Sequence, residues 1–265
     1  MIFVLDACSA INLLHIFKDD DTLLEDIFTT YSITFSEKVL KEVDNNLFSD
    51  KVFLELSQKQ DIRNIKNSLF EIDKNKDEKS QKYLKNITNY NKLNGEFFSS
   101  ALALSLSRLE KDYILFVTDD IPAKNEFLSF FEEHRIGDIV STANFLYILY
   151  QLNEEDISIK ESFFNLKREY LIEIEGFEQK INHLKLKYQN KKEDYFLDTL
   201  ISYLKNIEIE KLQTFEIKTR LPLDIKKQAK KIQEYMNQSF TNKKILFDEI
   251  DGYLQFIQEK KQYRL

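Results

Sequence analysis

The spacing of hydrophobic residues changes near residue 163, and this change divides the sequence into two patterns. Upstream, short apolar runs alternate with stretches that carry apolar residues at helical spacing, which predicts strands alternating with helices. Downstream, apolar residues recur at intervals of three or four; they are Phe163, Leu166, Tyr170, Ile174, Phe177, Ile181, Leu184 and Tyr188. Such a seam predicts one long helix that packs along a partner. We therefore expect an α/β domain over residues 1–172 and an all-helical domain over residues 173–265.

The first pattern indicates a parallel sheet. The expected strands cover residues 2–5, 31–35, 113–117 and 137–140, and helices are expected to begin near residues 7, 36, 95, 122 and 142. Strands that alternate with helices form a parallel sheet with helices on both faces. In the second pattern, shorter seams over residues 196–207, 225–236 and 246–257 predict further helices that pack as a bundle or hairpin.

The scarcity of glycine, histidine and cysteine excludes several kinds of site. The chain has 4 glycines, all isolated, so no phosphate-cradling loop and no GxSxG turn can be written. Its 3 histidines form no zinc motif, and Cys8, the single cysteine, has no partner for a disulfide. We expect Cys8 to be a small buried side chain. Any metal ion must therefore be held by oxygen atoms.

Acidic residues follow two of the expected strands. Asp6 ends the first apolar run, and Asp119 and Asp120 follow residues 113–117. Ligands of open parallel sheets bind beyond the carboxyl ends of the strands, so these carboxylates converge if the two strands are neighbours. Glu96, at the start of a helix, and Glu42, within one, can point at the same place.

Carboxylates in one cleft need compensation. Two anions at ~4 Å repel by ~4 kcal/mol at an effective dielectric near 20, so protons or cations must be present. Mg²⁺ or Mn²⁺ suits an all-oxygen site and binds substrate phosphate. A pair of such ions would activate water for attack on phosphorus, which predicts phosphodiester hydrolysis.

Each acidic residue also has a structural interpretation. Asp6 can cap the first helix, and Asp119 or Asp120 can cap the helix that Pro122 opens. Glu96 can interact with the dipole of its own helix, and Glu42 can be a solvated helix residue.

Five segments together resemble a PIN domain. They are VLDACSAINLL near the amino terminus, VLKEV around Glu42, NGEFFSSALALSLS around Glu96, VTDDIPAKNEF after the expected strand, and RIGDIVSTANFLYIL, which is similar to the segment that follows in bacterial members. The resemblance covers about residues 1–172 and implies a metal-dependent ribonuclease, as in VapC-like toxins. The ligands that it implies are Asp6, Glu42, Glu96, Asp119 and Asp120.

The resemblance leaves some positions open. The T-x-D pattern of the family selects Asp120, whereas adjacency to the strand end favours Asp119, and both stay in the expected site. Ser9 and Asn12 are alternative hydrogen-bonding partners that support the ligands or contact the substrate.

The expected function is therefore a divalent-metal-dependent endoribonuclease that uses Mg²⁺ or Mn²⁺ and acts on RNA, with single-stranded DNA as the other substrate. A role as the toxin of a toxin–antitoxin system or as an antiphage effector rests on the resemblance. The helical region is expected to bind a protein partner, to self-associate or to position RNA. The alternative is an inactive PIN-like scaffold that acts as an interaction module through its carboxyl-terminal helices.

Two further expectations concern location and surface charge. No apolar run approaches the ~18 residues of a membrane span, and MIFVLDACSA has no basic segment, so we expect a cytoplasmic protein with no membrane partner. The later helices carry many lysines, which are either a solvated face or contacts for phosphate: Lys226, Lys227, Lys230, Lys231, Lys243 and Lys244.

Overall fold

The end of the chain belongs to the same folded unit as its beginning. The structure is a computed structural model that describes residues 1–18, 21–47, 74–88, 90, 92–152, 158–189 and 192–262. The first unit comprises Met1–Leu166 and Glu249–Leu265, and the second comprises Lys167–Asp248. This division differs from the expected one at residue 172: the break lies six residues earlier, and Glu249–Leu265 groups with the first unit instead of a continuous carboxyl-terminal domain.

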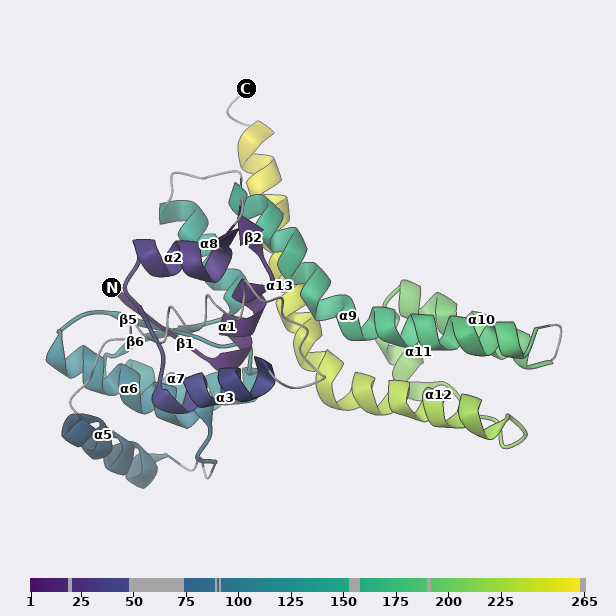
Figure 1. Cartoon of the computed structure of the whole chain (residues 1–265), viewed down its shortest axis with the longest axis horizontal. Coiled ribbons are helices and arrows are strands. Elements are labelled where there is room, and N and C mark those ends of the chain that lie inside the picture. Colours follow the sequence, from purple (N-terminus) through teal and green to yellow (C-terminus); the bar gives the residue numbers. More distant parts are fainter. Residues whose placement is uncertain are drawn as a thin grey trace. The chain divides into compact units, whose positions relative to one another are not determined.

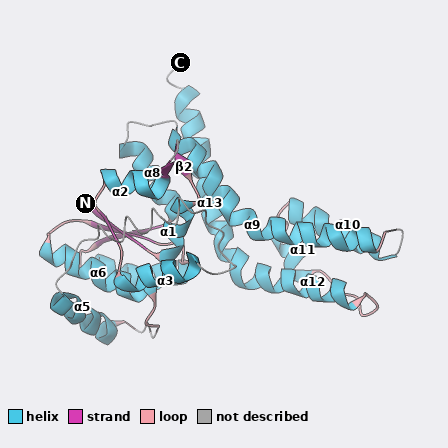
Figure 2. Cartoon of the chain, in the orientation of Figure 1, coloured by secondary structure: helices cyan, strands magenta, loops and turns pink. Residues whose placement is uncertain are grey.

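A parallel sheet lies in the first unit (Figures 1 and 2). Its strands are β1 (Ile2–Leu5), β4 (Ile33–Thr34), β5 (Ile114–Val117) and β6 (Gly137–Val140). Within the described residues the strand order is β4-β1-β5-β6, and every neighbouring pair is parallel. Val4 pairs with Phe116 and Leu5 with Val117, so β1 and β5 end at the same level. The two strands are therefore neighbours, which is the condition under which the sequence predicted that their carboxylates converge.

Helices cover both faces of this sheet. The helices with residues in the first unit are α1 (Ala7–Leu14), α2 (Leu23–Thr30), α3 (Glu37–Leu47), α5 (Lys74–Ile87), α6 (Gly95–Leu109), α7 (Ile121–Glu133), α8 (Thr142–Leu152), the start of α9 (Ser158–Lys187) and the end of α13 (Thr241–Gln262). Val4 packs into one core with Phe97 of α6 and Phe127 of α7. Phe3, the residue before Val4, points to the other face of the sheet. There the centre of its ring lies 4.9 Å from that of Phe145 in α8.

The direction of chain progression reverses between β1 and β5. From β1 the chain proceeds to β4 on one side, and from β5 it proceeds to β6 on the other side. A short antiparallel pair, β2 (Phe17–Lys18) and β3 (Asp21–Thr22), lies between α1 and α2. In open parallel sheets the crevice at such a reversal, beyond the carboxyl ends of the strands, is where ligands bind.

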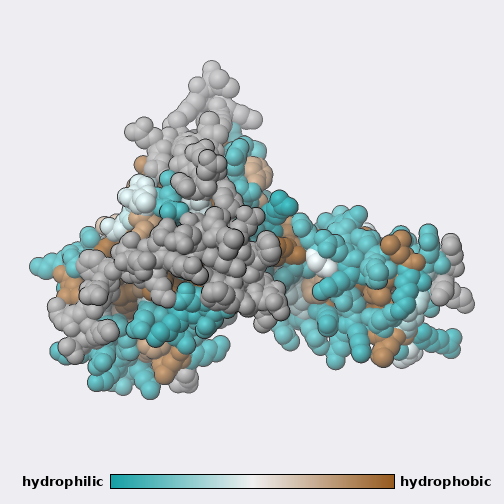
Figure 3. Space-filling model, viewed as in Figure 1, coloured by the Kyte–Doolittle hydropathy of each residue, from teal (hydrophilic) through white to brown (hydrophobic). Residues whose placement is uncertain are grey.

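The second unit is helical. It contains the rest of α9 and α13 together with α10 (Lys192–Lys205), α11 (Ile209–Thr214), α12 (Leu223–Tyr235) and a π-helical turn at Met236–Phe240. Ile174 and Ile181 of the predicted seam are buried in its core with Leu200 and Ile232. Figure 3 shows a largely hydrophilic surface over α10 and α12 with isolated hydrophobic patches, as is ordinary for a solvated helical surface.

Among the residues that the structure describes, no helix combines the length and the apolar composition that crossing a bilayer requires.

Candidate active site

Asp6 lies at the carboxyl end of β1 and caps the helix that follows. Its Oδ1 accepts a hydrogen bond from the Ser9 backbone N at 2.6 Å, and its Oδ2 accepts one from the Thr118 hydroxyl at 2.5 Å. Ser9 is fully buried and donates its own hydroxyl to the Val117 carbonyl at 3.3 Å, which ties α1 to β5. Ser9 therefore positions Asp6 from the interior of the protein and does not face a substrate.

The environment of Asp6 favours its neutral form. Burial and, second, the nearby Asp119 carboxylate raise the pKa of Asp6 from 3.8 to about 7, although hydrogen bonds from Thr118 and Ser9 act in the opposite direction. The side chain is only 2% exposed. A carboxylate at this position is therefore unstable unless a positive charge compensates it.

Asp119 lies at the end of β5, next to Asp6, and fastens two helices to the sheet. Its Oδ2 accepts hydrogen bonds from Asn12 Nδ2 at 2.8 Å and from the Thr142 hydroxyl at 2.9 Å, and its Oδ1 accepts one from the Thr142 backbone N at 2.8 Å. Asn12, which the sequence placed in the supporting shell, thus holds Asp119 rather than Asp6. These contacts fix the orientation of the Asp119 carboxylate.

Asp120 is more exposed than Asp119 and caps α7. Its Oδ1 accepts a hydrogen bond from the Ala123 backbone N at 2.9 Å. Its own backbone N donates to the Thr118 hydroxyl at 3.1 Å, and that hydroxyl in turn donates to Asp6. Thr118 therefore connects Asp6 with Asp120.

Glu42 and Glu96 meet at the amino terminus of α6. Glu42 Oε1 accepts a hydrogen bond from the Gly95 backbone N at 3.2 Å. A Cβ atom at Gly95 would lie 2.5 Å from Glu42 Oε2 and 3.1 Å from Val39, so a larger residue there would displace the Glu42 carboxylate from its present position. Asn94 begins the helix, because its side chain accepts a hydrogen bond from the Phe97 backbone N at 3.4 Å.

Glu96 has an unsatisfied oxygen. Within the described residues its Oε2 is buried and has no hydrogen-bond partner. Burial raises the pKa of Glu96, and the Asp120 and Glu42 carboxylates raise it further. A buried acceptor without a donor is costly, and a cation is one partner that removes the cost.

The structure thus places the predicted residues in two charge-coupled groups. Asp6 is coupled to Asp119, and Glu96 is coupled to Asp120 and Glu42. The Thr118 hydroxyl and the adjacency of Asp119 to Asp120 join the groups. The capping interpretation is also correct for Asp6 and Asp120, so the same side chains cap helices and lie near other acids.

The described residues contain no set of three or more Asp, Glu, His or Cys side chains that already surrounds a common point as a metal ion would require. Mg²⁺ demands fewer protein ligands, because it commonly keeps several waters and binds one or two carboxylates with substrate phosphate. The unpartnered oxygen of Glu96 and the all-oxygen donor set fit such an ion better than a closed protein cage.

Comparisons with known proteins do not assign the chain. No family model matches it, and comparisons with curated proteins and with solved structures give no match either. The resemblance to PIN domains therefore stays a prediction that rests on the sequence motifs.

Several contributors to this site were not predicted. Thr118 lies within the VTDD segment, and Tyr90, whose hydroxyl accepts a hydrogen bond from Asn94 at 2.8 Å, has its pKa raised by burial and by Glu96 and Asp120. Thr142 follows β6, where the preceding Ser141 hydroxyl donates to Glu249 of α13 at 2.6 Å. Nothing in the sequence near Glu249 indicates this contact, because it depends on the return of α13 to the first unit.

The prediction for Cys8 is wrong. Its side chain is exposed rather than buried. Cys8 follows Ala7 in the first turn of α1, whereas Ser9 and Ala10 face the core.

Proposed function

We propose that the first unit is a metal-dependent nuclease that hydrolyses phosphodiester bonds in RNA. One observation carries the proposal: at the carboxyl edge of the sheet, no lysine, arginine or histidine among the described residues forms an ion pair with Asp6, Glu42, Glu96 or Asp120. The ionised forms of these acids therefore need a positive charge from outside the described residues, and a divalent cation supplies one.

The proposed ligands differ in how many of their carboxylate oxygens already accept hydrogen bonds from the protein. Glu96 has a buried oxygen without a partner, and Asp120 and Glu42 each use one oxygen in a described hydrogen bond. These three are the proposed direct ligands, together with Asp6. When bound, the cation would neutralise the phosphate and activate a water for attack on phosphorus.

The remaining residues hold this arrangement in place. Thr118 orients Asp6, while Asn12 and Thr142 orient Asp119. Asp119 in this proposal acts on Asp6 through its charge and does not need to bind the ion directly. Hydrogen bonds of this kind around metal ligands set ligand orientation and affinity.

RNA as the substrate, and the toxin or antiphage role, come from the resemblance of the sequence to PIN domains. The acids at the carboxyl edge of the sheet would allow cleavage of either RNA or single-stranded DNA, because the cation would contact the phosphate and not the sugar. Cytoplasmic location and association through the second unit are further proposals of the same origin.

Cleavage of labelled RNA and single-stranded DNA with Mg²⁺ or Mn²⁺ tests the proposal. We expect Glu96→Gln to reduce cleavage by about 100-fold or more, since it keeps the shape of the side chain but removes an anionic ligand. Glu133→Gln is the matched control, because Glu133 is an exposed residue at the far end of α7. Equal cleavage by wild type and Glu96→Gln, or cleavage that persists in EDTA, would contradict the mechanism.

A binding measurement separates a metal site from a set of helix caps. Mn²⁺ at a hundredfold excess over its Kd should stabilise the wild type by about 2.7 kcal/mol through mass action. We expect this shift of the melting temperature to shrink in Glu96→Gln and to persist in Glu133→Gln. No shift with the wild type at millimolar Mn²⁺ would exclude the cation site.

One observation favours the second candidate, an inactive scaffold. Both oxygens of Asp6 and both of Asp119 already accept hydrogen bonds within the protein. If the protein is such a scaffold, these acids only stabilise the fold, and the helical unit carries out the function by binding a partner. Absence of both cleavage and an Mn²⁺-dependent shift would favour this function.

A further inference from the structure

The second unit contains a pocket between two of its helices. The pocket has a volume of about 460 Å³. Gln179, Lys180 and His183 of α9 lie on one side, and Asp224 and Gln228 of α12 lie on the other. A volume of this size is within the range that accommodates small ligands.

Glycine keeps the α9 side of this pocket open. A Cβ atom built at Gly176, which also lines the pocket, would meet no other atom within 4 Å. Glycine in the middle of a helix lowers helix stability, and no close approach of a neighbour requires one here. A larger side chain at residue 176 would therefore enter free space.

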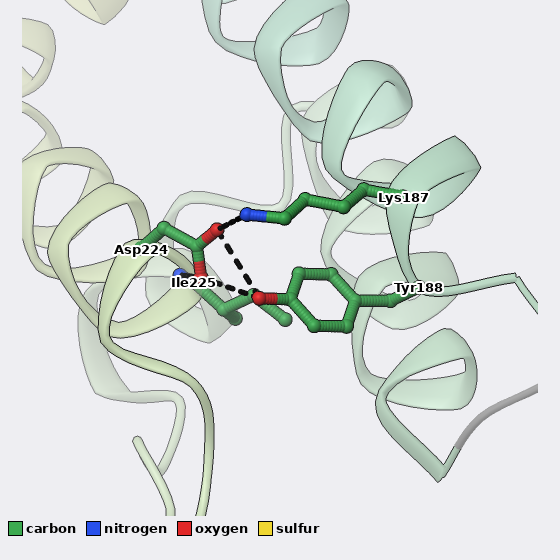
Figure 4. A network of polar contacts seen from close by, with 4 residues as sticks. All are labelled: Lys187, Tyr188, Asp224 and Ile225. Atoms are coloured by element: carbon green, nitrogen blue, oxygen red, sulfur yellow. Dashed lines mark hydrogen bonds and ion pairs between the residues drawn. The ribbon is translucent and has the colours of Figure 1, made fainter.

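The single acid of the pocket is already neutralised by the protein (Figure 4). Asp224 accepts hydrogen bonds from Lys187 Nζ at 2.7 Å and from the Tyr188 hydroxyl at 3.0 and 3.2 Å. The bond from Lys187 is the main cause that lowers the pKa of Asp224. Asp224 thus contributes to the pocket lining a negative charge that is already paired.

The other polar groups of the pocket lack acceptors. Gln228 Nε2 is buried, and within the described residues it has no hydrogen-bond partner. In the same part of the chain no carboxylate pairs with Lys180, whose one recorded contact is with the Phe177 ring at 6.0 Å, and no acceptor is recorded for His183. Lys180 and His183 are exposed to solvent, so both groups are available to a ligand, whereas the Gln228 amide is buried.

Neighbouring charge favours an anion. Lys227 and Lys231 lie three residues after Asp224 and Gln228 on α12, so they are adjacent on the helix surface. Glu178 of α9, the acid adjacent to Gln179, is held by Lys205 at 3.4 Å. Lys180 lines the cavity and Lys227 and Lys231 lie near it on α12, which matches a ligand rich in negatively charged oxygen atoms.

We propose that this pocket binds a phosphate group, supplied either by a free nucleotide or by a nucleic-acid backbone. Lys180 provides the charge and His183 donates a hydrogen bond to the phosphate oxygens, while the buried Gln228 amide forms part of the pocket wall. Asp224, paired with Lys187, lines the α12 side of the pocket. The site lies wholly within the second unit and does not depend on the proposed nuclease activity.

Titration of the full chain in EDTA with inorganic phosphate, uridine monophosphate and a short oligouridylate tests the proposal by calorimetry and by NMR. The chain has 3 histidines, so the imidazole signal of His183 can be assigned with single substitutions. Lys180→Gln removes the charge, and Gly176→Leu fills the cavity with a residue that favours helix. Lys230→Gln removes one charge from the exposed face of α12, where Lys230 pairs with Glu234 at 3.7 Å, and is the matched control.

We expect binding that shifts the His183 signal and weakens about tenfold or more in Lys180→Gln and in Gly176→Leu, with Lys230→Gln close to wild type. Binding of phosphate and of uridine monophosphate identifies a nucleotide site, whereas binding of the oligouridylate alone identifies the backbone as the source. No binding of any probe at about 10 mM, which leaves less than about 3 kcal/mol of affinity, would overturn the proposal. Equal loss in all three variants would also overturn it, because the interaction would then reflect net charge alone.

Discussion

The two units neutralise their acids in different ways. In the second unit, lysines of the chain pair with acids on neighbouring elements: Lys185 with Asp198, Lys187 with Asp224, Lys205 with Glu178 and Lys243 with Glu173. At the carboxyl edge of the sheet, hydroxyl, amide and backbone N–H groups surround the acids, and no described cation pairs with Asp6 or Glu96. In the second unit these acids are therefore neutralised by lysines of the chain. At the sheet edge of the first unit, the ionised acids leave a net negative charge in a partly buried place.

This difference has opposite consequences for the pKa values. The pKa of Asp6 is raised to about 7, mainly by burial, whereas the pKa of Asp224 is lowered, mainly by the hydrogen bond from Lys187. A raised pKa means that the ionised acid destabilises the fold, and a lowered one means that it stabilises the fold. The acids of one unit are therefore suited to holding a ligand, and those of the other to holding helices together.

The largest expected effect is on the pH dependence of the metal-free protein. Between about pH 4 and pH 7 the folded state binds more protons at Asp6 than the unfolded state does, so stability falls as the pH rises through this window. At about 1.4 kcal/mol per pKa unit, the loss above pH 7 is about 4 kcal/mol. Asp6→Asn, which keeps an N-cap, should therefore be more stable than wild type at pH 8 and similar at pH 4.

Urea unfolding in EDTA at the two pH values measures this difference. The free energy of unfolding of Asp6→Asn relative to wild type should rise from pH 4 to pH 8. A variant that is equally destabilised at both pH values would show that Asp6 acts as a simple cap.

A smaller effect is expected where the protein orients its own acids. Thr142→Val keeps the shape of a fully buried side chain but removes the hydroxyl that donates to Asp119 at 2.9 Å. Loss of a buried hydrogen bond to a charged group should lower the free energy of unfolding by about 1–3 kcal/mol. Thr199→Val in α10 is the matched control, because the Thr199 hydroxyl donates to an exposed carbonyl of its own helix, and we expect a change within about 0.5 kcal/mol.

Chemical denaturation at neutral pH compares these two variants. If both lost the same stability, the hydrogen bonds at the sheet edge would be no more important than surface ones, and the contrast between the units would fail.

The smallest effect is expected at the ion pairs of the second unit. Asp224→Asn removes the pair with Lys187, whose two side chains are 58% and 36% exposed, so the loss should be less than about 1 kcal/mol at pH 7. Since the folded pKa of Asp224 is lowered, this contribution is present above about pH 4 and disappears as the pH falls through the folded pKa. Thermal unfolding at low and high salt should show that added salt reduces the difference. If Asp224→Asn lost several kcal/mol of unfolding free energy at both salt concentrations, this ion pair would behave like the buried groups of the first unit and the contrast would fail.

The sequence predicted the parts of the fold that local pattern determines. The strands expected at residues 2–5 and 137–140 have their observed bounds, and the regular seam from Phe163 indicated α9. Because parallel strands end at one edge, the same pattern placed Asp6 and Asp119 beside each other.

Other features depend on signals that were weak or distant. The helix α2 was not predicted, although Thr22 and Glu25 form a capping pair in which the Thr22 hydroxyl accepts from the Glu25 backbone N at 3.3 Å. The contact of Ser141 with Glu249 joins positions more than a hundred residues apart, and no local spacing encodes it. The helix start expected at residue 95 is confirmed, but nothing in the sequence indicated that the Glu42 carboxylate lies where a side chain at Gly95 would be.

The return of α13 to the first unit has a consequence for the order of folding during synthesis. Glu249–Leu265 emerges from the ribosome only after Lys167–Asp248 has been made, a delay on the order of seconds at ~5–20 residues per second. Until then Ser141, beside the residue that holds Asp119, lacks its carboxylate partner, and Tyr147 lacks the ring of Tyr253 that stacks on it at 4.5 Å. A nascent chain would therefore gain these contacts between α8 and α13 last, when translation of the helical unit is already over.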